Sequence, residues 1–250
     1  MKFVFKTDQG RIRQHNEDSG GVFENKGGDS LAIVADGMGG HKAGDIASGM
    51  SVDLLQEMWE AADKIETPEA AETWFKDSIN IVNRKLFKHS QTEPTCKGMG
   101  TTLVAAICTD RFTTIANIGD SRCYLLSDAG LQQLTEDHSL VNELVKTGEI
   151  TKEDAEHHPR KNVLLKALGT EQGVKSDIKT ICFEEDNMLL LCSDGLSNKV
   201  TEQQMLATLN MEAELGTKAD TLIELANKHG GEDNITVIIV EYVASDESGW

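Results

Sequence analysis

Residues 31–40 read LAIVADGMGG, and the organisation of the chain follows from this stretch. Five apolar residues lead directly into Asp36 and a glycine-rich turn follows, so the pattern predicts a buried strand that delivers one carboxylate to a bend. An isolated ionised carboxylate is costly to remove from water and would normally be neutralised or avoided at such a place. The position of Asp36 therefore indicates a cation beside it.

Three further acids adjoin apolar, strand-like runs: Asp120 after residues 115–119, Asp194 after residues 188–193, and Asp233 before residues 235–240. In an antiparallel sheet the end of one strand lies beside the start of its neighbour, so we expect all four acids to share one sheet edge. Four carboxylates at one edge repel one another unless a cation lies between them. Hard oxygen ligands suit magnesium or manganese, which makes a site for one of these ions the favoured interpretation.

Length and charge limit the class of protein. The chain has 250 residues, a net charge of −18 and a pI near 4.7. No Pro/Ser-rich linker divides it, so we predict one domain over residues 1–243 and a polar tail over residues 244–250. The acidic balance argues against nucleic acid as a partner, because binding a phosphate backbone needs basic stripes. An ordinary acidic protein would have a similar charge.

The cysteines and the N-terminus indicate the compartment. The five cysteines are odd in number and form no C-x-x-C pair, which is typical of small buried hydrophobic residues in a reducing compartment. Residues 1–10 contain no sustained apolar stretch, and no run approaches the length of a membrane span. We therefore predict a cytoplasmic protein without membrane insertion.

Periodicity predicts an α+β fold. Ile46, Met50, Leu54, Met58 and Ala62 fall four apart, with Leu55 and Trp59 beside them, and predict one face of a helix. Thr67 caps a second helix. Strands are expected over residues 2–6, 31–35, 101–108, 112–118, 122–126, 131–134, 178–183, 188–192 and 235–240, with the four from 101 to 134 forming a meander. Residues 136–169 interrupt this order with two helices. Tight hairpins broken by helix pairs favour an antiparallel layered fold over βαβ winding.

The acids belong to an ordered set of short motifs. These are Arg13-x-x-Asn16-Glu17-Asp18, Asp36-Gly37, Gly119-Asp120-Ser121, Ser193-Asp194-Gly195 and Asp233-Asn234. The set resembles the metal-dependent protein phosphatases of type 2C, and the strings DGMGGH and EDHSL are similar to those of the bacterial branch. The resemblance extends over residues 7–240, and the ordered combination is far more specific than any one motif.

The resemblance implies a four-layer sandwich, in which two central antiparallel β-sheets are flanked by pairs of antiparallel helices. It also implies two Mn²⁺ or Mg²⁺ ions at one end of the sandwich, with a weaker third site. Asp36 would bridge the two ions and the carbonyl of Gly37 would join it on the first. The remaining roles that the resemblance implies are Asp194 and Asp233 on the second ion, Asp18 and Glu17 through metal-bound water, Asp120 with Asp194 at the third site, and Arg13 on the substrate phosphate.

The activity implied by the resemblance is hydrolysis of phosphoserine and phosphothreonine in proteins, by direct attack of a water or hydroxide that bridges the two ions. Two divalent ions can lower the pKa of such a water toward neutrality, and a guanidinium can take two phosphate oxygens at once. We expect a monomer that opposes a Ser/Thr protein kinase. The alternatives are a phosphatase of small phosphate esters or of one dedicated regulatory partner, and a non-catalytic metal-binding interaction module.

Some assignments keep a simpler alternative. Asp-Gly and Asp-Asn are common turn formers, so each acid taken singly could serve only a turn, and Arg13 could be a solvated cation beside Glu17. Eukaryotic members of the family have a histidine directly after Asp-Gly as the general acid, whereas this chain has Met38. His41 is the nearest candidate, and a metal-bound water is the alternative proton donor. In the family, the segment that corresponds to residues 136–169 is a flap that affects substrate handling.

Overall fold

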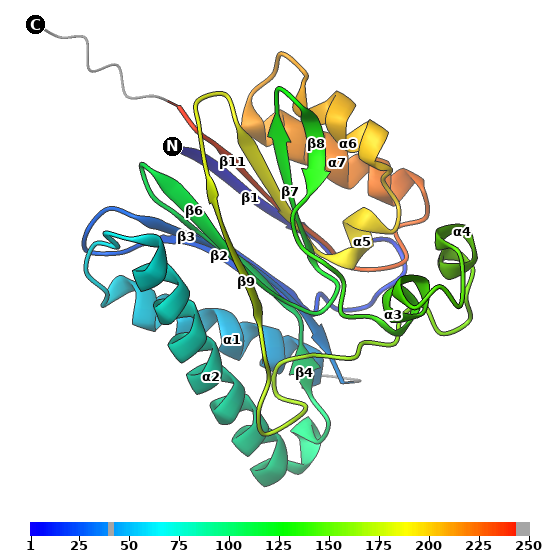
Figure 1. Ribbon diagram of the computed structural model, residues 1–250. Coiled ribbons are helices and arrows are strands. Elements are labelled where there is room, and N and C mark those ends of the chain that lie inside the picture. Colours follow the sequence, from blue (N-terminus) through cyan, green and yellow to red (C-terminus); the bar gives the residue numbers. More distant parts are fainter. Residues whose placement is uncertain (40–42, 244–250) are drawn as a thin grey trace, which may run out of the picture.

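Two antiparallel β-sheets, stacked face to face, form the centre of the molecule (Figure 1). The structure is a computed structural model that describes residues 1–39 and 43–243. In order across the first sheet lie β1 (Lys2–Asp8), β11 (Ile235–Glu241), β10 (Met188–Cys192), β7 (Arg122–Ser127) and β8 (Gly130–Gln133). The second sheet contains β2 (Asp18–Glu24), β3 (Ser30–Met38), β5 (Leu103–Cys108), β6 (Phe112–Ile118) and β9 (Asp177–Cys182), with the short β4 (Gly100–Thr101) paired to the end of β3.

The apolar run of β3 is continuous because both faces of this strand are covered. Ala32 and Val34 pack between the two sheets against residues such as Leu191 and Ile238. Leu31 and Ile33 point the other way, into the core that the helices close. Successive side chains of a strand point to opposite faces, so a strand in the middle layers of a sandwich needs apolar residues at every position.

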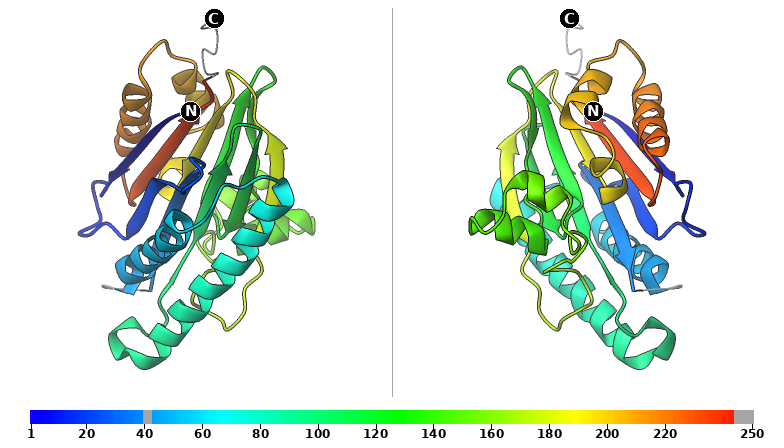
Figure 2. Two further views of the ribbon diagram at one scale, coloured as in Figure 1. Left: turned by 90° about the vertical axis from the view of Figure 1, so that its left-hand side faces the viewer. Right: turned by 90° about the vertical axis from the view of Figure 1, so that its right-hand side faces the viewer.

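Helices cover the outer face of each sheet and complete four layers (Figure 2). The second sheet is covered by α1 (Ala43–Glu60) and α2 (Pro68–Thr92), and η1 (Pro94–Cys96) follows α2. The first sheet is covered by α5 (Asp194–Ser197), α6 (Glu202–Leu209) and α7 (Leu215–Lys228). The predicted α+β four-layer sandwich is confirmed. Thr67 caps α2 as expected, because its side chain accepts a hydrogen bond from the backbone N–H of Ala70 at 3.2 Å.

The buried face of α1 agrees only in part with the predicted one: Leu55 and Trp59 are fully buried as expected, whereas the main predicted row is not. Ile46, Met50, Leu54 and Met58 are only partly buried and lie at the edge of the core. The fully buried positions carry mainly small side chains, among them Ala47, Ser48 and Ser51. Small residues let the helix approach the second sheet closely, and a pattern built from large apolar residues reveals only Leu55 and Trp59 of that face.

The predicted meander is wrong at one point. Strands β5 and β6 pair, and β7 and β8 pair, but β6 and β7 belong to different sheets. The chain crosses between the sheets at residues 119–121, where Gly119 has a φ of +101°. A Cβ at Gly119 would lie 2.6 Å from the side chain of Thr102, so this turn requires glycine. The crossing carries Asp120 to the end of the sandwich.

The expectation that the four acids share one sheet edge is also wrong. Asp36 lies in the second sheet, whereas Asp194 and Asp233 adjoin strands of the first. They come together because the ends of the two sheets meet, so the acids face one another across the sandwich.

Residues 136–169 contribute no strand to either sheet and lie beside the same end of the sandwich (Figure 1). They contain α3 (Leu140–Lys146) and α4 (Lys152–Glu156), the two predicted helices. A capping box between Thr151 and Asp154 begins α4. Within residues 1–39 and 43–243, none of the helices has both the length and the apolar composition that crossing a bilayer would need. Four cysteines are buried as predicted, but Cys182, on edge strand β9, is exposed.

Candidate metal centre

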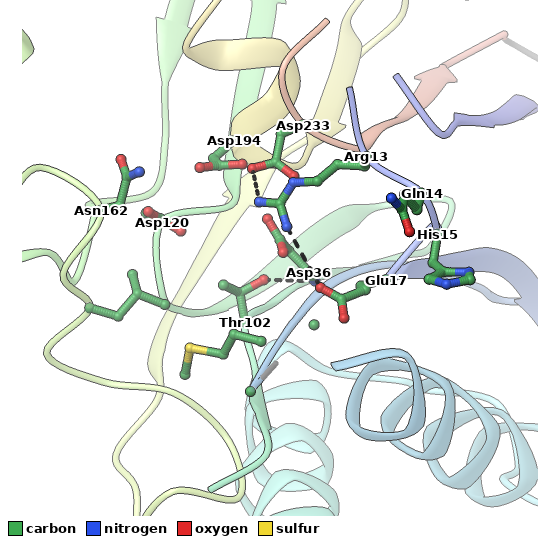
Figure 3. Close-up of a pocket in the computed structure, with 14 residues that line it drawn as sticks. Arg13, Gln14, His15, Glu17, Asp36, Thr102, Asp120, Asn162, Asp194 and Asp233 are labelled. Atoms are coloured by element: carbon green, nitrogen blue, oxygen red, sulfur yellow. Dashed lines mark hydrogen bonds and ion pairs between the residues drawn. The ribbon is translucent and has the colours of Figure 1, made fainter. Parts of the chain in front are cut away.

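A cavity of about 560 Å³ opens where the ends of the two sheets meet (Figure 3). Its walls come from the β1–β2 loop, the end of β3, the 119–121 turn, the segment after α4, the start of α5 and the residue before β11. The lining residues are Arg13, Gln14, His15, Glu17, Asp36, Gly37, Met38, Gly39, Thr102, Asp120, Asn162, Leu164, Asp194 and Asp233. The structure thus brings together in one cavity seven of the residues singled out in the sequence.

Asp36 stands at the end of β3 with its backbone fully held. Its N–H donates to Oγ1 of Thr102 at 3.0 Å, and its carbonyl accepts from the Thr102 N–H at 2.9 Å. Thr102 is itself held by a hydroxyl–hydroxyl hydrogen bond of 2.7 Å to Ser121. With the backbone satisfied in this way, the carboxylate is left to face the cavity.

Gly37 allows three segments to meet closely behind the cavity. A Cβ there would lie 2.1 Å from the carbonyl oxygen of Gly44 in the first turn of α1 and 2.6 Å from that of Glu17. The Gly37 N–H donates to the Glu17 carbonyl at 3.1 Å. Any larger residue would push α1 away from β3, so this position needs glycine for packing reasons alone.

Asp18 lies directly opposite Asp36 in the β2–β3 ladder and is buried. Its Oδ2 accepts a hydrogen bond from the Ser193 hydroxyl at 2.7 Å, whereas its buried Oδ1 has no hydrogen-bond partner in the described structure. Burial raises the pKa of Asp18 to about 7, and the negative charges of Asp194 and Asp233 act in the same direction.

The pKa values of Asp36, Asp120 and Asp194 are raised as well. Burial, followed by the charges of Asp18, Asp194 and Asp120, raises the pKa of Asp36 well above its usual range. Burial and the charge of Asp194 raise the pKa of Asp120 to about 7. Burial and Asp233 raise the pKa of Asp194, whose Oδ1 is a second buried oxygen without a hydrogen-bond partner in the described structure. The cluster therefore lacks positive charge.

Arg13 supplies part of that charge. Its Nη2 donates to Oδ2 of Asp233 at 2.7 Å, and its Nη1 lies 3.8 Å from Oε2 of Glu17 (Figure 3). Burial lowers the pKa of Arg13, but the attraction of Asp233 and Glu17 outweighs it and the net pKa is raised. The guanidinium thus contacts one of the predicted metal ligands in addition to facing the cavity.

Asn234 holds the loop that carries Arg13, a role that the sequence analysis missed. It is 3% exposed, and its Nδ2 donates to the carbonyls of Gln9 and His15, both at 2.9 Å. Its Oδ1 accepts from the Glu17 N–H at 2.8 Å. Asn directly before a buried apolar strand was the available signal, because a buried amide must find partners for its donors and its acceptor.

His138 holds the turn that presents Asp120, and this role was also missed. Its N–H donates to the Gly119 carbonyl at 2.9 Å, and its Nδ1 accepts from the Gly119 N–H at 3.1 Å. Beside it, Arg122 forms a forked pair with Asp137, with Nη2 to Oδ2 at 2.7 Å and Nε to Oδ1 at 2.9 Å. The base of segment 136–169 is therefore bonded to the turn that carries Asp120.

The donor set fits hard divalent cations. The cavity offers carboxylate and carbonyl oxygens and no thiolate, and the two orphaned carboxylate oxygens need a partner that a cation would provide. Within residues 1–39 and 43–243, no three acidic, His or Cys side chains are arranged tightly enough to enclose an ion as they stand. Because Arg13 donates to Oδ2 of Asp233, the guanidinium competes with an ion for this oxygen. His41, the predicted acid, lies outside the described residues.

Known proteins with this chemistry resemble the chain over most of its length. The family model Protein phosphatase 2C matches residues 10–224. The serine/threonine phosphatase stp of Listeria monocytogenes serotype 4b (strain F2365) is 55% identical over 96% of this chain and 96% of its own length. The crystal structure of serine/threonine phosphatase Stp1 from Staphylococcus aureus matches with a TM-score of 0.93 and 39% identity, over 97% of this chain and 95% of that chain. The catalytic domain of serine threonine protein phosphatase PstP, in complex with two manganese ions, matches with a TM-score of 0.84 and 33% identity, over 97% of this chain and 98% of that chain.

Proposed function

The chain belongs to the protein phosphatase 2C family and is a metal-dependent serine/threonine phosphatase, and we propose that the cavity between its two sheets is the active site. The observation that carries this proposal is a cluster of four carboxylates whose pKa values are all raised: Asp36, Asp120 and Asp194 line the cavity, and Asp18 lies opposite Asp36 in the β2–β3 ladder. Repulsion among neighbouring carboxylates costs stability, and such clusters occur at functional sites where bound cations offset the repulsion.

We assign the metal ligands on this basis. Asp36 and the Gly37 carbonyl would hold one Mn²⁺ or Mg²⁺ ion, Asp194 and Asp233 would hold the other, and Asp120 with Asp194 would hold a weaker third. Asp18 would contribute through water rather than by direct contact. When bound, such ions lower the pKa of water and neutralise the charge of a phosphate group.

The residues of the chain itself then have separate tasks. Arg13 leaves Asp233 and binds two oxygens of the substrate phosphate, which a planar guanidinium does better than an ammonium. Asn234 keeps the loop of Arg13 in register with β11. Thr102 fixes the direction of Asp36, and the Ser193 hydroxyl orients Asp18 by donating to its Oδ2.

Residues 136–169 act as a flap over the site within the single domain of residues 1–243. Asn162 and Leu164 of this segment line the cavity, which supports a contact with the substrate polypeptide. A monomeric state, a cytosolic location and a Ser/Thr kinase as the opposing enzyme stay predictions.

Phosphate release from a phosphothreonyl peptide, with and without Mn²⁺, tests the function. We expect release that depends on Mn²⁺ and is lost in Asp36→Asn, with the circular dichroism spectrum unchanged. An aryl phosphate assayed in parallel separates a protein phosphatase from an esterase of small molecules. Wild-type release by Asp36→Asn at saturating Mn²⁺ would refute the assignment of the site.

A further inference from the structure

A second cavity, of about 720 Å³, lies away from the carboxylates, between the C-terminal part of α2 and the segment that leads into β9. Figures 1 and 2 show this segment running beside the lower half of α2. The lining residues are Arg84, Phe87, Lys88, Gln91, Thr92, Gln172 and Gly173. We call this cavity the α2 pocket.

The α2 pocket is basic in a strongly acidic protein. Among the residues that the structure describes, no acidic one lines it, although the chain carries a net charge of −18. Arg84 and Lys88 are exposed, and across residues 1–39 and 43–243 neither forms an ion pair. Helix α2 has no acidic residue between Asp77 and Glu93. Two cations are therefore available at this surface for an anion from another molecule.

Stabilisation of the helix does not account for both cations. Basic residues near a helix C-terminus interact favourably with the helix dipole, but the effect is confined to the last turn. Lys88 lies within about one turn of the final residue, Thr92, whereas Arg84 lies more than two turns before it. The helix dipole therefore accounts for Lys88 but not for Arg84.

The rest of the lining suits a polypeptide. Phe87 is partly buried and offers an apolar face, while Gln91 and Gln172 carry amides that can pair with peptide N–H and C=O groups. A nucleic acid fits poorly, because its regularly spaced phosphates need a long row of cations and only two line this pocket among the described residues. The chemistry of the pocket thus matches a peptide with carboxylate side chains.

A short series of neighbouring residues connects the α2 pocket with the active site. A Cβ at Gly100 would lie 2.9 Å from Cε of Met38, which lines the active site, and 2.7 Å from Cγ2 of Thr170. Thr170 is two residues before Gln172, a distance of at most about 7 Å along the chain. Asn83 fixes this segment to α2, since its Oδ1 accepts from the Gly169 N–H at 2.8 Å and its Nδ2 donates to the Glu171 carbonyl at 3.0 Å.

We propose that the α2 pocket binds an acidic stretch of the phosphoprotein substrate while the phosphorylated residue is in the active site. An extended peptide of about five residues spans about 17 Å, enough for the path from Met38 to Gln172. The acidic residues would therefore lie at least about five residues from the phosphothreonine. This inference rests on the proposed function, and the pocket would raise affinity for some substrates without taking part in the chemistry.

The test compares three proteins and two pairs of peptides. The proteins are the wild type, Arg84→Glu/Lys88→Glu, and the control Lys26→Glu/Lys64→Glu, which changes the charge equally at two exposed lysines near the start of α2. In one pair both peptides carry a phosphothreonine, and only one of them carries a glutamate cluster. The cluster is tested on the N-terminal and on the C-terminal side of the phosphothreonine. The other pair consists of the same sequences unphosphorylated and fluorescently labelled, for anisotropy without Mn²⁺.

We expect kcat/KM of the wild type to be roughly threefold to tenfold higher for the acidic phosphopeptide, the range for a few exposed ion pairs. The variant Arg84→Glu/Lys88→Glu should lose this preference and the anisotropy signal but keep its rate on the neutral peptide. The control Lys26→Glu/Lys64→Glu should retain the preference and the anisotropy signal. Equal kcat/KM for acidic and neutral peptides in the wild type, or an equal loss in the control, would overturn the proposal. Absence of turnover on the neutral peptide would count against the proposed function instead, since anisotropy reads the pocket without it.

Discussion

Replacing Asp18 by Asn should make the metal-free protein more stable, although it removes a residue of the candidate site. The pKa of Asp18 is about 7 in the folded protein against an ordinary value of 3.8. A difference of about three units corresponds to about 4 kcal/mol of unfavourable energy when the carboxyl is ionised. Asn keeps an oxygen for the Ser193 hydroxyl and presents an NH₂ group to the neighbouring carboxylates. Allowing about 2 kcal/mol for desolvating the amide, we expect a net gain of about 2 kcal/mol near pH 8.

Because the pKa of Asp18 is raised in the folded protein, the stability of the protein should depend on pH. A carboxyl with a raised folded-state pKa destabilises the protein above that pKa, and the penalty disappears as pH falls from about 7 toward about 4. The wild type should therefore gain stability on mild acidification in EDTA, and its deficit relative to Asp18→Asn should shrink over the same interval. Added Mn²⁺ should stabilise the wild type more than the variant.

Urea unfolding in EDTA at a series of pH values measures both proteins directly. Unchanged m-values would confirm that the difference is one of stability and not of the compactness of either state. The reasoning is refuted if folded Asp18→Asn is no more stable than the wild type near pH 8, or if the difference does not shrink on acidification.

Three further changes test other parts of the site. Arg13→Lys should raise KM for a phosphopeptide roughly tenfold, because an ammonium cannot take two phosphate oxygens in a fork; an unchanged KM would argue against the phosphate role. Asn234→Ala should lower the melting temperature and raise KM together, since it frees the loop of Arg13, and a drop in stability with an unchanged KM would limit it to a structural role. Replacing residues 141–161 by a short Gly-Ser linker should reduce kcat/KM for a phosphoprotein more than for an aryl phosphate, and equal losses would count against a flap.

The sequence was sufficient to predict the local elements and most of the cavity residues. Strand β3 could be recognised because an apolar run buried on both faces must end at a polar turn, and Asp36 with Gly37 marks that point. The start of α2 could be recognised from its cap, Thr67, because a cap acts over three residues and is visible in a short window. The resemblance to type 2C phosphatases supplied the sandwich and the set of acids.

Long-range pairing could not be predicted in the same way. Periodicity identifies a strand but does not say which sheet it joins, so the crossing at Gly119 was interpreted as a hairpin. The bonds of Asn234 to the 9–17 loop and of Arg13 to Asp233 join residues more than 200 positions apart. The small side chains on the buried face of α1 were not predicted, because Ala and Ser give little signal in a pattern of large apolar residues.

The central claim is that carboxylates from both sheets hold divalent ions in one cavity, and anomalous diffraction from a crystal soaked in Mn²⁺ tests it most directly. We expect two manganese peaks between the sheets, with Asp36, Asp194 and Asp233 among their ligands and Arg13 turned away from Asp233. Strong manganese peaks elsewhere on the molecule, with these three carboxylates in contact with none, would contradict the account.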